Sequence, residues 1–386
     1  MSKRIISMIL TAIVCLSCMS VGVSAAPAEG GTLELSAPSA ILIEQTTGNV
    51  LFEKNPDERR PLASVTKIMT MLLTMEAIDG GKITLEDKVV ASERAKSMGG
   101  STIFLDTGEE MSVNDLLKGI AVASGNDACV AMAEYIAGSE EGFVNMMNAR
   151  AAELGMTNTN FVNTNGLDAD NHYSSARDIA TMSRELLKHK KIFDYTTIWM
   201  DSLRDGKFQL ANTNKLIRFY KGANGLKTGS TDKALCCLSG SAMRDNLQLI
   251  CVVMAAPTSP QRFADASKML DYGFANYAIK RIVTKDESLG DAPVVNGMEQ
   301  TVPAVAKDDY DALTAKGDNT DIKRELVFNE TITAPIKIGD KIGEIQLSTA
   351  EGPLASVDIV AAGNVAKMTY GAMLGRTLMA WLGSVK

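Results

Sequence analysis

Two side chains one helical turn apart could carry out chemistry together. Ser64 and Lys67 lie three positions apart in the stretch 61–75, where apolar residues recur at helical spacing behind a proline. The pair should therefore lie at the N-terminal end of a buried helix, within reach of each other. Burial lowers the pKa of a lysine because it disfavours the charged form. A neutral amine beside a serine can act as the base that activates the hydroxyl, so the pair indicates nucleophilic serine catalysis.

The same pair has a structural alternative, in which Ser64 caps an ordinary core helix and Lys67 extends to solvent. Ser-x-x-Lys is too short to decide between them. Two further motifs follow in order: Ser124-Gly125-Asn126 in a break between two predicted helices, and Lys227-Thr228-Gly229 leading into a predicted strand. A tight loop can aim two side chains into a cleft, and a glycine in a strand leaves room for a substrate to lie along it. Together the three motifs favour the catalytic interpretation.

The surrounding elements must bring these motifs together. Turn residues between apolar runs predict a hairpin over 40–53, and continuous apolar runs predict strands over 234–242 and 247–254. Helical spacing predicts the helices 61–79, 114–122, 127–138, 140–154, 175–190 and 260–280, with a polar loop over 158–174. The order of strands, helices, strands and a final helix predicts an α+β fold. Its antiparallel sheet would carry packed helices and a helical insert.

The three motifs resemble those of the penicillin-recognising serine enzymes. The match is greatest to the low-molecular-mass penicillin-binding proteins that are D-alanyl-D-alanine carboxypeptidases, and the segments 62–70, 123–128 and 225–229 carry it. The resemblance implies a β-lactamase/transpeptidase-like domain with helices on both faces of its sheet. It implies removal of the terminal D-alanine from a peptidoglycan stem peptide, and acylation by β-lactam antibiotics. The sequence contains no metal or cofactor motif.

The resemblance also implies roles for the first two motifs. Ser64 would attack the carbonyl between the two D-alanines and form an acyl-enzyme. Lys67 would be the general base for this step and for the deacylating water, with a pKa lowered by burial and by the second cation, Lys227. Ser124 would relay a proton to the leaving amine. Asn126 would hold the substrate amide and orient Lys67.

The third motif is expected to bind the substrate. Lys227 and Thr228 would bind its terminal carboxylate beside Gly229, and the backbone N–H groups of Ser64 and Ser230 would form the oxyanion hole. Some relatives carry histidine where this chain has Ser230, which affects the expected pH profile and substrate choice. Arg262 is a further candidate for carboxylate recognition, with a surface salt bridge as its alternative.

Three other functions are alternatives to this interpretation: a β-lactamase, a penicillin-binding sensor and an endopeptidase. A class A β-lactamase needs a loop glutamate to activate water, but the loop 158–174 contains only Asp168 and Asp170 as acids. A catalytically silent penicillin-binding sensor would have the same fold, and an endopeptidase would use the same motifs. His172 and His189 have no spaced partners, which argues against a zinc site or a serine–histidine triad.

The rest of the chain predicts its location and its other domains. The net charge of −7 argues against a nucleic-acid partner. Residues 1–26 form a predicted secretory signal, so the protein should act outside the cytoplasmic membrane, in the cell wall space. Domain boundaries are expected at 27–285 for the peptidase domain, 286–362 for a small β-rich domain and 363–386 for a basic amphipathic helix. We expect that helix to anchor the protein to a membrane surface, because its charge pattern is basic; the alternative is that it packs back onto the β domain.

The cysteines of the mature chain show no Cys-x-x-Cys spacing. We interpret them as buried small apolar residues rather than a disulfide framework or a metal site. They are Cys129, Cys236, Cys237 and Cys251.

Overall fold

A computed structural model describes residues 33–318 and 320–383, which form two compact units. The larger unit ends at Ala278 and the smaller unit begins at Ile279. The predicted secretory signal, residues 1–26, lies outside the described residues.

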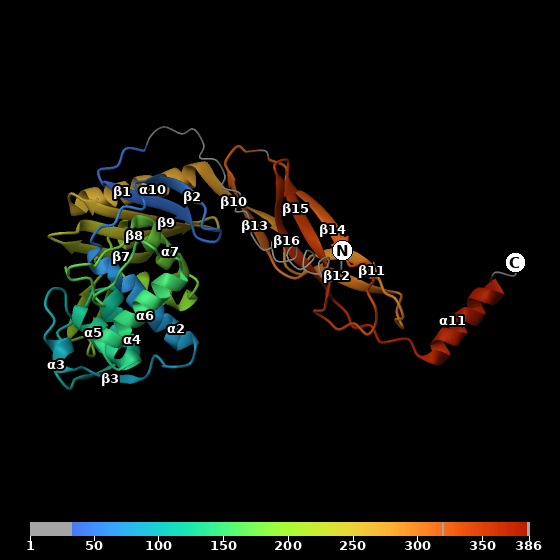
Figure 1. Ribbon diagram of the computed structural model, residues 1–386, viewed down its shortest axis with the longest axis horizontal. Coiled ribbons are helices and arrows are strands. Elements are labelled where there is room, and N and C mark those ends of the chain that lie inside the picture. The colour runs from blue at the N-terminus through green and yellow to red at the C-terminus, as the bar shows by residue number, and fades with distance from the viewer. Residues whose placement is uncertain (1–32, 319, 384–386) are drawn as a thin grey trace, which may run out of the picture. The chain divides into compact units, whose positions relative to one another are not determined.

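The larger unit is built on a five-stranded antiparallel sheet in the order β2-β1-β9-β8-β7. Figure 1 shows α10 on one face of this sheet and α7 on the other, with further helices beyond α7. The central strand β9 is buried along its whole length, whereas β7 lies at an edge. The expected antiparallel sheet with helices on both faces is confirmed. The bounds are β1(Ser39–Glu44), β2(Val50–Lys54), β7(Ala223–Thr231), β8(Leu235–Arg244), β9(Leu247–Ala256), α7(Ala176–Leu186) and α10(Ser259–Asn276).

The helix behind the first motif begins later than predicted. A 3₁₀ turn, η1(Ala63–Thr66), comes first, and α2(Lys67–Asp79) follows it. A helix cannot run continuously from Pro61, because Ala63 has a φ of +48°, outside the helical region. Almost every residue of α2 is buried, not only the predicted stripe, which is typical of a helix in the centre of a helical layer.

The other elements follow the predicted order with shifted ends. Ser112 caps its helix by accepting from the N–H of Asp115, as its capping pattern indicates. Helix α7 ends at Leu186 rather than near 190, and α10 ends at Asn276 because the chain continues as a strand from Tyr277. The remaining bounds are α3(Glu93–Lys96), α4(Val113–Ala121), α5(Asn126–Ala137), α6(Glu140–Glu153), η2(Lys190–Ile192), α8(Phe193–Thr196), α9(Leu216–Phe219), β3(Lys88–Val90), β4(Glu110–Ser112), β5(Met200–Leu203) and β6(Phe208–Ala211).

The smaller unit is the predicted all-β domain followed by one helix. Its antiparallel sheet has the order β11-β12-β16-β15-β14, and β10 pairs with β13. The apolar runs 294–295 and 332–338 were expected to form strands of this domain. They are coil instead, joined to neighbouring segments by isolated bridges, and Ile332, Ala334 and Ile336 are their buried residues. The bounds are β10(Tyr277–Val283), β11(Ser288–Pro293), β12(Thr301–Ala306), β13(Tyr310–Ala315), β14(Lys323–Phe328), β15(Lys341–Thr349), β16(Gly352–Ala361) and α11(Tyr370–Gly383).

Candidate active site

The first motif brings Ser64 and Lys67 into contact. Lys67 Nζ lies 2.9 Å from Ser64 Oγ. It also lies 2.6 Å from two acceptors, Asn126 Oδ1 and the backbone oxygen of Asn165. Lys67 is fully buried and Ser64 is half-buried, so the hydroxyl remains accessible while the amine does not. Burial lowers the pKa of Lys67 to about 8.

These three neighbours orient the amine. A neutral amine has two hydrogens and one lone pair. The carbonyl oxygens of Asn126 and Asn165 can only accept hydrogen bonds, so they take both hydrogens. The lone pair then faces the hydroxyl of Ser64. The arrangement is therefore able to remove a proton from Ser64.

The second motif lies in a strained loop that two neighbouring segments hold. Ser124 has a φ of +62° and is buried, and the residues after it begin α5. Asn126 donates from its side chain to the oxygen of Gly99 and from its backbone to the oxygen of Ser101, both at 2.7 Å. The carboxylate of Asp127 accepts from backbone N–H groups at 103 and 105. The loop 99–105 thus fixes the side of the cleft that carries this motif.

The third motif lies on the edge strand β7. Lys227 is buried, and its pKa is lowered well below its usual value, first by burial and then by the charge of Lys67. Thr228 donates from its hydroxyl to that of Thr213 at 2.7 Å. The N–H of Thr213 in turn donates to the oxygen of Val122, just before the second motif. Thr213 is exposed and was not expected from the sequence, because no motif marks it.

Gly229 has a different role from the one expected. A Cβ at this position would lie 2.9 Å from both the oxygen of Leu62 and the backbone nitrogen of Ser64. The space that glycine leaves is therefore occupied by the turn that carries Ser64, and is not free for a substrate. This close approach brings strand β7 against the backbone N–H of Ser64. The next residue of the strand is Ser230, which is exposed.

Arg262 lies on α10 and is buried, so the alternative of a surface salt bridge is wrong. Its Nη1 donates to the backbone oxygens of Gly229 and Cys237, at 3.1 and 3.2 Å. Its Nη2 donates to the hydroxyl of Ser259. Through these bonds the guanidinium braces strands β7 and β8.

The loop 158–174 contributes more to the site than its sequence suggested. The oxygen of Asn165 accepts from Lys67, and the oxygen of Thr164 accepts from the hydroxyl of Thr70. His172 contacts Thr66, inside the first motif. The sequence carries only an Asn-Gly turn signal here, which does not indicate what the loop would pack against.

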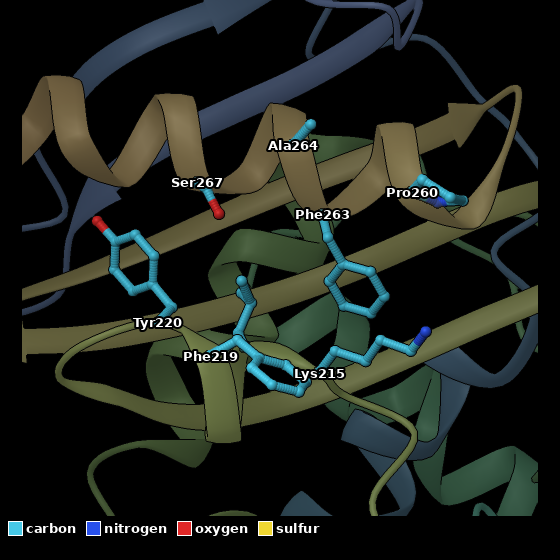
Figure 2. Close-up of a pocket in the computed structure, with 8 residues that line it drawn as sticks. Lys215, Phe219, Tyr220, Pro260, Phe263, Ala264 and Ser267 are labelled. Carbon is cyan, nitrogen blue, oxygen red and sulfur yellow. The ribbon is translucent and has the colours of Figure 1, made fainter.

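A hollow elsewhere in the larger unit is separate from these residues. It has a volume of about 360 Å³ and lies between α9 and α10. Figure 2 shows the rings of Phe219, Tyr220 and Phe263 around it. None of the three motifs lines it, so its size does not make it the catalytic site.

Neither the acidic groups nor the thiols of the described chain form a metal site. Within residues 33–318 and 320–383, no three His, Cys, Asp or Glu side chains are arranged to hold a metal ion. The four cysteines are free thiols; Cys236 is half-buried and the other three are buried.

Comparison with known proteins gives matches over both units. The family model described as D-alanyl-D-alanine carboxypeptidase matches residues 23–258. The model described as Penicillin-binding protein 5, C-terminal domain, matches residues 277–367. The D-alanyl-D-alanine carboxypeptidase DacF of Bacillus subtilis is 47% identical over 349 residues, which cover 89% of this chain and 90% of that protein. DacC of Escherichia coli is 34% identical, with 81% of this chain and 80% of that protein covered.

Solved structures agree with these matches. Penicillin binding protein 5 from Haemophilus influenzae superposes with a TM-score of 0.72 at 31% identity, covering 88% of this chain and all of that one. PBP3 from Streptococcus pneumoniae, described as a peptidoglycan synthesis regulatory factor, gives a TM-score of 0.74 at 29% identity, covering 86% of this chain and all of that one. The ampicillin-bound penicillin-binding protein D2 from Listeria monocytogenes gives 0.58 at 32% identity, covering 63% of this chain and all of that one.

Proposed function

The chain belongs to the D-alanyl-D-alanine carboxypeptidase family, and we propose that Ser64 is the nucleophile with which it removes the terminal D-alanine from peptidoglycan stem peptides. The protein is a serine-type hydrolase of the cell wall. The observation that carries the assignment of Ser64 is its 2.9 Å contact with a buried lysine whose other two neighbours are acceptors.

Acylation begins with the transfer of the Ser64 proton to Lys67. The pKa of Lys67, about 8, leaves an appreciable neutral fraction near neutral pH. The Ser64 oxygen attacks the carbonyl carbon between the two D-alanines and forms a tetrahedral intermediate. Its negative oxygen is stabilised by the backbone N–H groups of Ser64 and Ser230. The close packing of Gly229 against Ser64 supports this pairing of donors.

Collapse of the intermediate releases D-alanine. Lys67 gives the proton it took from Ser64 to the leaving amine by way of Ser124, and so becomes neutral again. Asn126 holds the substrate amide while its Oδ1 keeps Lys67 oriented. A water molecule then attacks the acyl-enzyme, with Lys67 again as base. Lys227 and Thr228 hold the carboxylate of the substrate, and a β-lactam carboxylate would occupy the same place.

The test is acylation of the purified chain from residue 27 by a fluorescent penicillin, with release of D-alanine from a D-Ala-D-Ala peptide followed in parallel. We expect a penicilloyl adduct on Ser64 by mass spectrometry, and D-alanine release that disappears in Ser64→Ala. An adduct without D-alanine release would favour a penicillin-binding sensor or an endopeptidase. Rapid penicillin hydrolysis with no lasting adduct would instead favour a β-lactamase.

We also propose that the protein is exported and associates with a membrane surface through α11. None of the helices in the described part of the chain combines the length and hydropathy needed to span a bilayer. Helix α11 exposes large apolar side chains, among them Leu374 and Trp381, and no acidic residue follows Asp358. Apolar exposure together with basic charge is typical of helices that lie in an anionic membrane surface.

Flotation with anionic and with neutral lipid vesicles tests this second proposal. The chain from residue 27 should float with anionic vesicles, and a chain that ends at residue 369 should not. Equal flotation of both chains would overturn the role of α11.

A further inference from the structure

His172 is buried beside the catalytic motif, and no step of the proposed mechanism uses it. Its side chain is only 5% exposed. Its Nδ1 lies 2.9 Å from the backbone nitrogen of Val162, and its Nε2 lies 2.8 Å from the hydroxyl of Thr66. Thr66 is the last residue of the turn η1, which carries Ser64, and it directly precedes Lys67. The imidazole therefore contacts the first motif itself.

These contacts determine which ring nitrogen carries the proton. The N–H of Val162 can only donate, so Nδ1 accepts and is unprotonated. Nε2 therefore carries the hydrogen of the neutral ring and donates it to Thr66 Oγ1. The hydroxyl of Thr66 then donates to the backbone oxygen of Ala63 at 2.8 Å. The result is a relay of three hydrogen bonds in one consistent direction, from the backbone at 162 to the carbonyl at 63.

The relay ends on the residue that shapes the nucleophile turn. Ala63 precedes Ser64 and has a φ of +48°, which costs a non-glycine residue about 1–3 kcal/mol. Such a conformation persists only where the surroundings impose it. The loop 158–174 does this from a second point as well, because a Cβ at Gly166 would lie 1.9 Å from the oxygen of Ala63.

We propose that His172, acting through Thr66, is a positioning residue that holds the Ser64 turn in the geometry required for acylation. This proposal rests on the assignment of Ser64 as the nucleophile. The loop then has two tasks: the oxygen of Asn165 orients the base, and the imidazole of His172 holds the backbone that carries the nucleophile.

The environment of the ring keeps the relay intact at neutral pH. Protonation would put a hydrogen on Nδ1, opposite the N–H of Val162, and would break the first bond of the relay. Burial lowers the pKa of His172 to about 4, and the charge of Asp168 opposes this shift. Phe161, whose ring centre lies 6.0 Å from that of the imidazole, adds no charge.

Nitrogen NMR of histidine-labelled protein tests the relay directly. The chain contains only two histidines, so His189→Asn assigns both spectra. We expect His172 to show an unprotonated Nδ1 and a protonated Nε2 from pH 5.5 to 8, with a midpoint of titration near 4. The opposite tautomer, or a midpoint above 6, would overturn the proposal without affecting the assignment of Ser64.

Kinetics test whether the relay positions the nucleophile. Thr66→Val keeps the shape of the side chain and removes the hydroxyl, so the acylation rate constant with penicillin should fall about tenfold to a hundredfold. Thr66→Ser should restore it to within about threefold. His172→Gln, whose amide can still donate to Thr66, should lie in between.

Thr74→Val is the matched control. Thr74 is equally buried in α2, and its hydroxyl also donates to a backbone oxygen, that of Thr70, at 2.8 Å. This variant should lose stability as Thr66→Val does but should acylate as the wild type. Equal acylation by Thr66→Val and wild type would overturn the proposal. If Thr66→Val does not fold, a wild-type acylation rate in His172→Leu would overturn the proposal in the same way. Loss of the adduct in the wild type itself would instead refute the assignment of Ser64.

Discussion

The lysines of the catalytic cleft differ from two lysines of the small β domain in burial and in the direction of their pKa shifts. Lys67 and Lys227 are fully buried, and burial is the largest cause of the lowered pKa of each. Lys307 and Lys341 are about half exposed and share the carboxylate of Asp358, at 2.9 and 2.7 Å, and this pairing raises the pKa of both. The difference indicates that, of the lysines compared, those of the cleft bear the cost of burial because a neutral or proton-sharing amine is useful there.

Backbone strain is distributed in the same way. In the cleft, Ala63 and Ser124 have positive φ angles although neither residue type favours them. In the small domain the positive angles of non-glycine residues fall on Asp286 and Asn296, types that tolerate this conformation. Neighbouring segments must therefore hold the backbone in place in the cleft. The same holds for a few other positions of the larger unit, namely Phe104, Arg204, Leu235 and Ala255.

The largest expected effect comes from removing the buried amine of the cleft. Lys67→Met should lower the acylation rate constant by about a hundredfold to ten-thousandfold, because a general base contributes on this scale. Stopped-flow measurement with a fluorescent penicillin reports it. An acylation rate within tenfold of the wild type would mean that another group is the base.

The pH dependence of acylation is the second expected effect. Lys67 must be neutral to accept a proton, so the rate should fall about tenfold per pH unit below the pKa of about 8 and level off above it. The measurement is the acylation rate constant between pH 5.5 and 9. A flat profile over this range would contradict a lysine base with this pKa.

The same titration should affect stability. The pKa of Lys67 is lower in the folded state than its usual value of 10.5, so the unfolded state binds more protons between pH 8 and 10.5. The free energy of unfolding contributed by this group should therefore rise with pH through that window, and Lys67→Met should lack this rise. Urea denaturation of both proteins at several pH values measures the difference.

The third effect concerns the backbone contact behind the nucleophile. Gly166→Ala places a Cβ against the oxygen of Ala63 at a φ of +92°, so we expect a loss of about 2–4 kcal/mol in unfolding free energy and at least tenfold slower acylation. Gly155→Ala is its control, because Gly155 has a φ of +72° and nothing within 4 Å of the added Cβ. It should lose only about 1 kcal/mol and acylate normally. Similar acylation by both variants would refute the importance of the contact.

The smallest effect is expected in the small domain. Asp358→Asn removes the carboxylate that Lys307 and Lys341 share on the surface, where such pairs add little to stability. The midpoint of thermal unfolding should change little, and acylation of Ser64 should not change. A large loss of stability would show that the comparison between the two sets of lysines is wrong.

Local patterns in the sequence were enough to predict the elements and the motif residues. The hairpin of β1 and β2, the strands β8 and β9 and the cap at Ser112 follow from turn chemistry, apolar runs and capping preference. The pairing of Ser64 with Lys67 follows from helical spacing. Each of these involves residues close together in the chain, where residue type and spacing decide the structure.

The tertiary structure decided which distant residues complete the cleft. Asn165 meets Lys67 across 98 positions, and His172 meets Thr66 across 106. The fit of Gly229 against the nucleophile turn and the position of Arg262 behind β7 depend in the same way on how the sheet and helices pack. Periodicity describes one element at a time, so it predicts the face on which a side chain lies but not the segment that packs against it. For this reason the sequence alone determined the candidate reacting groups, and only the folded chain determined what holds them in place.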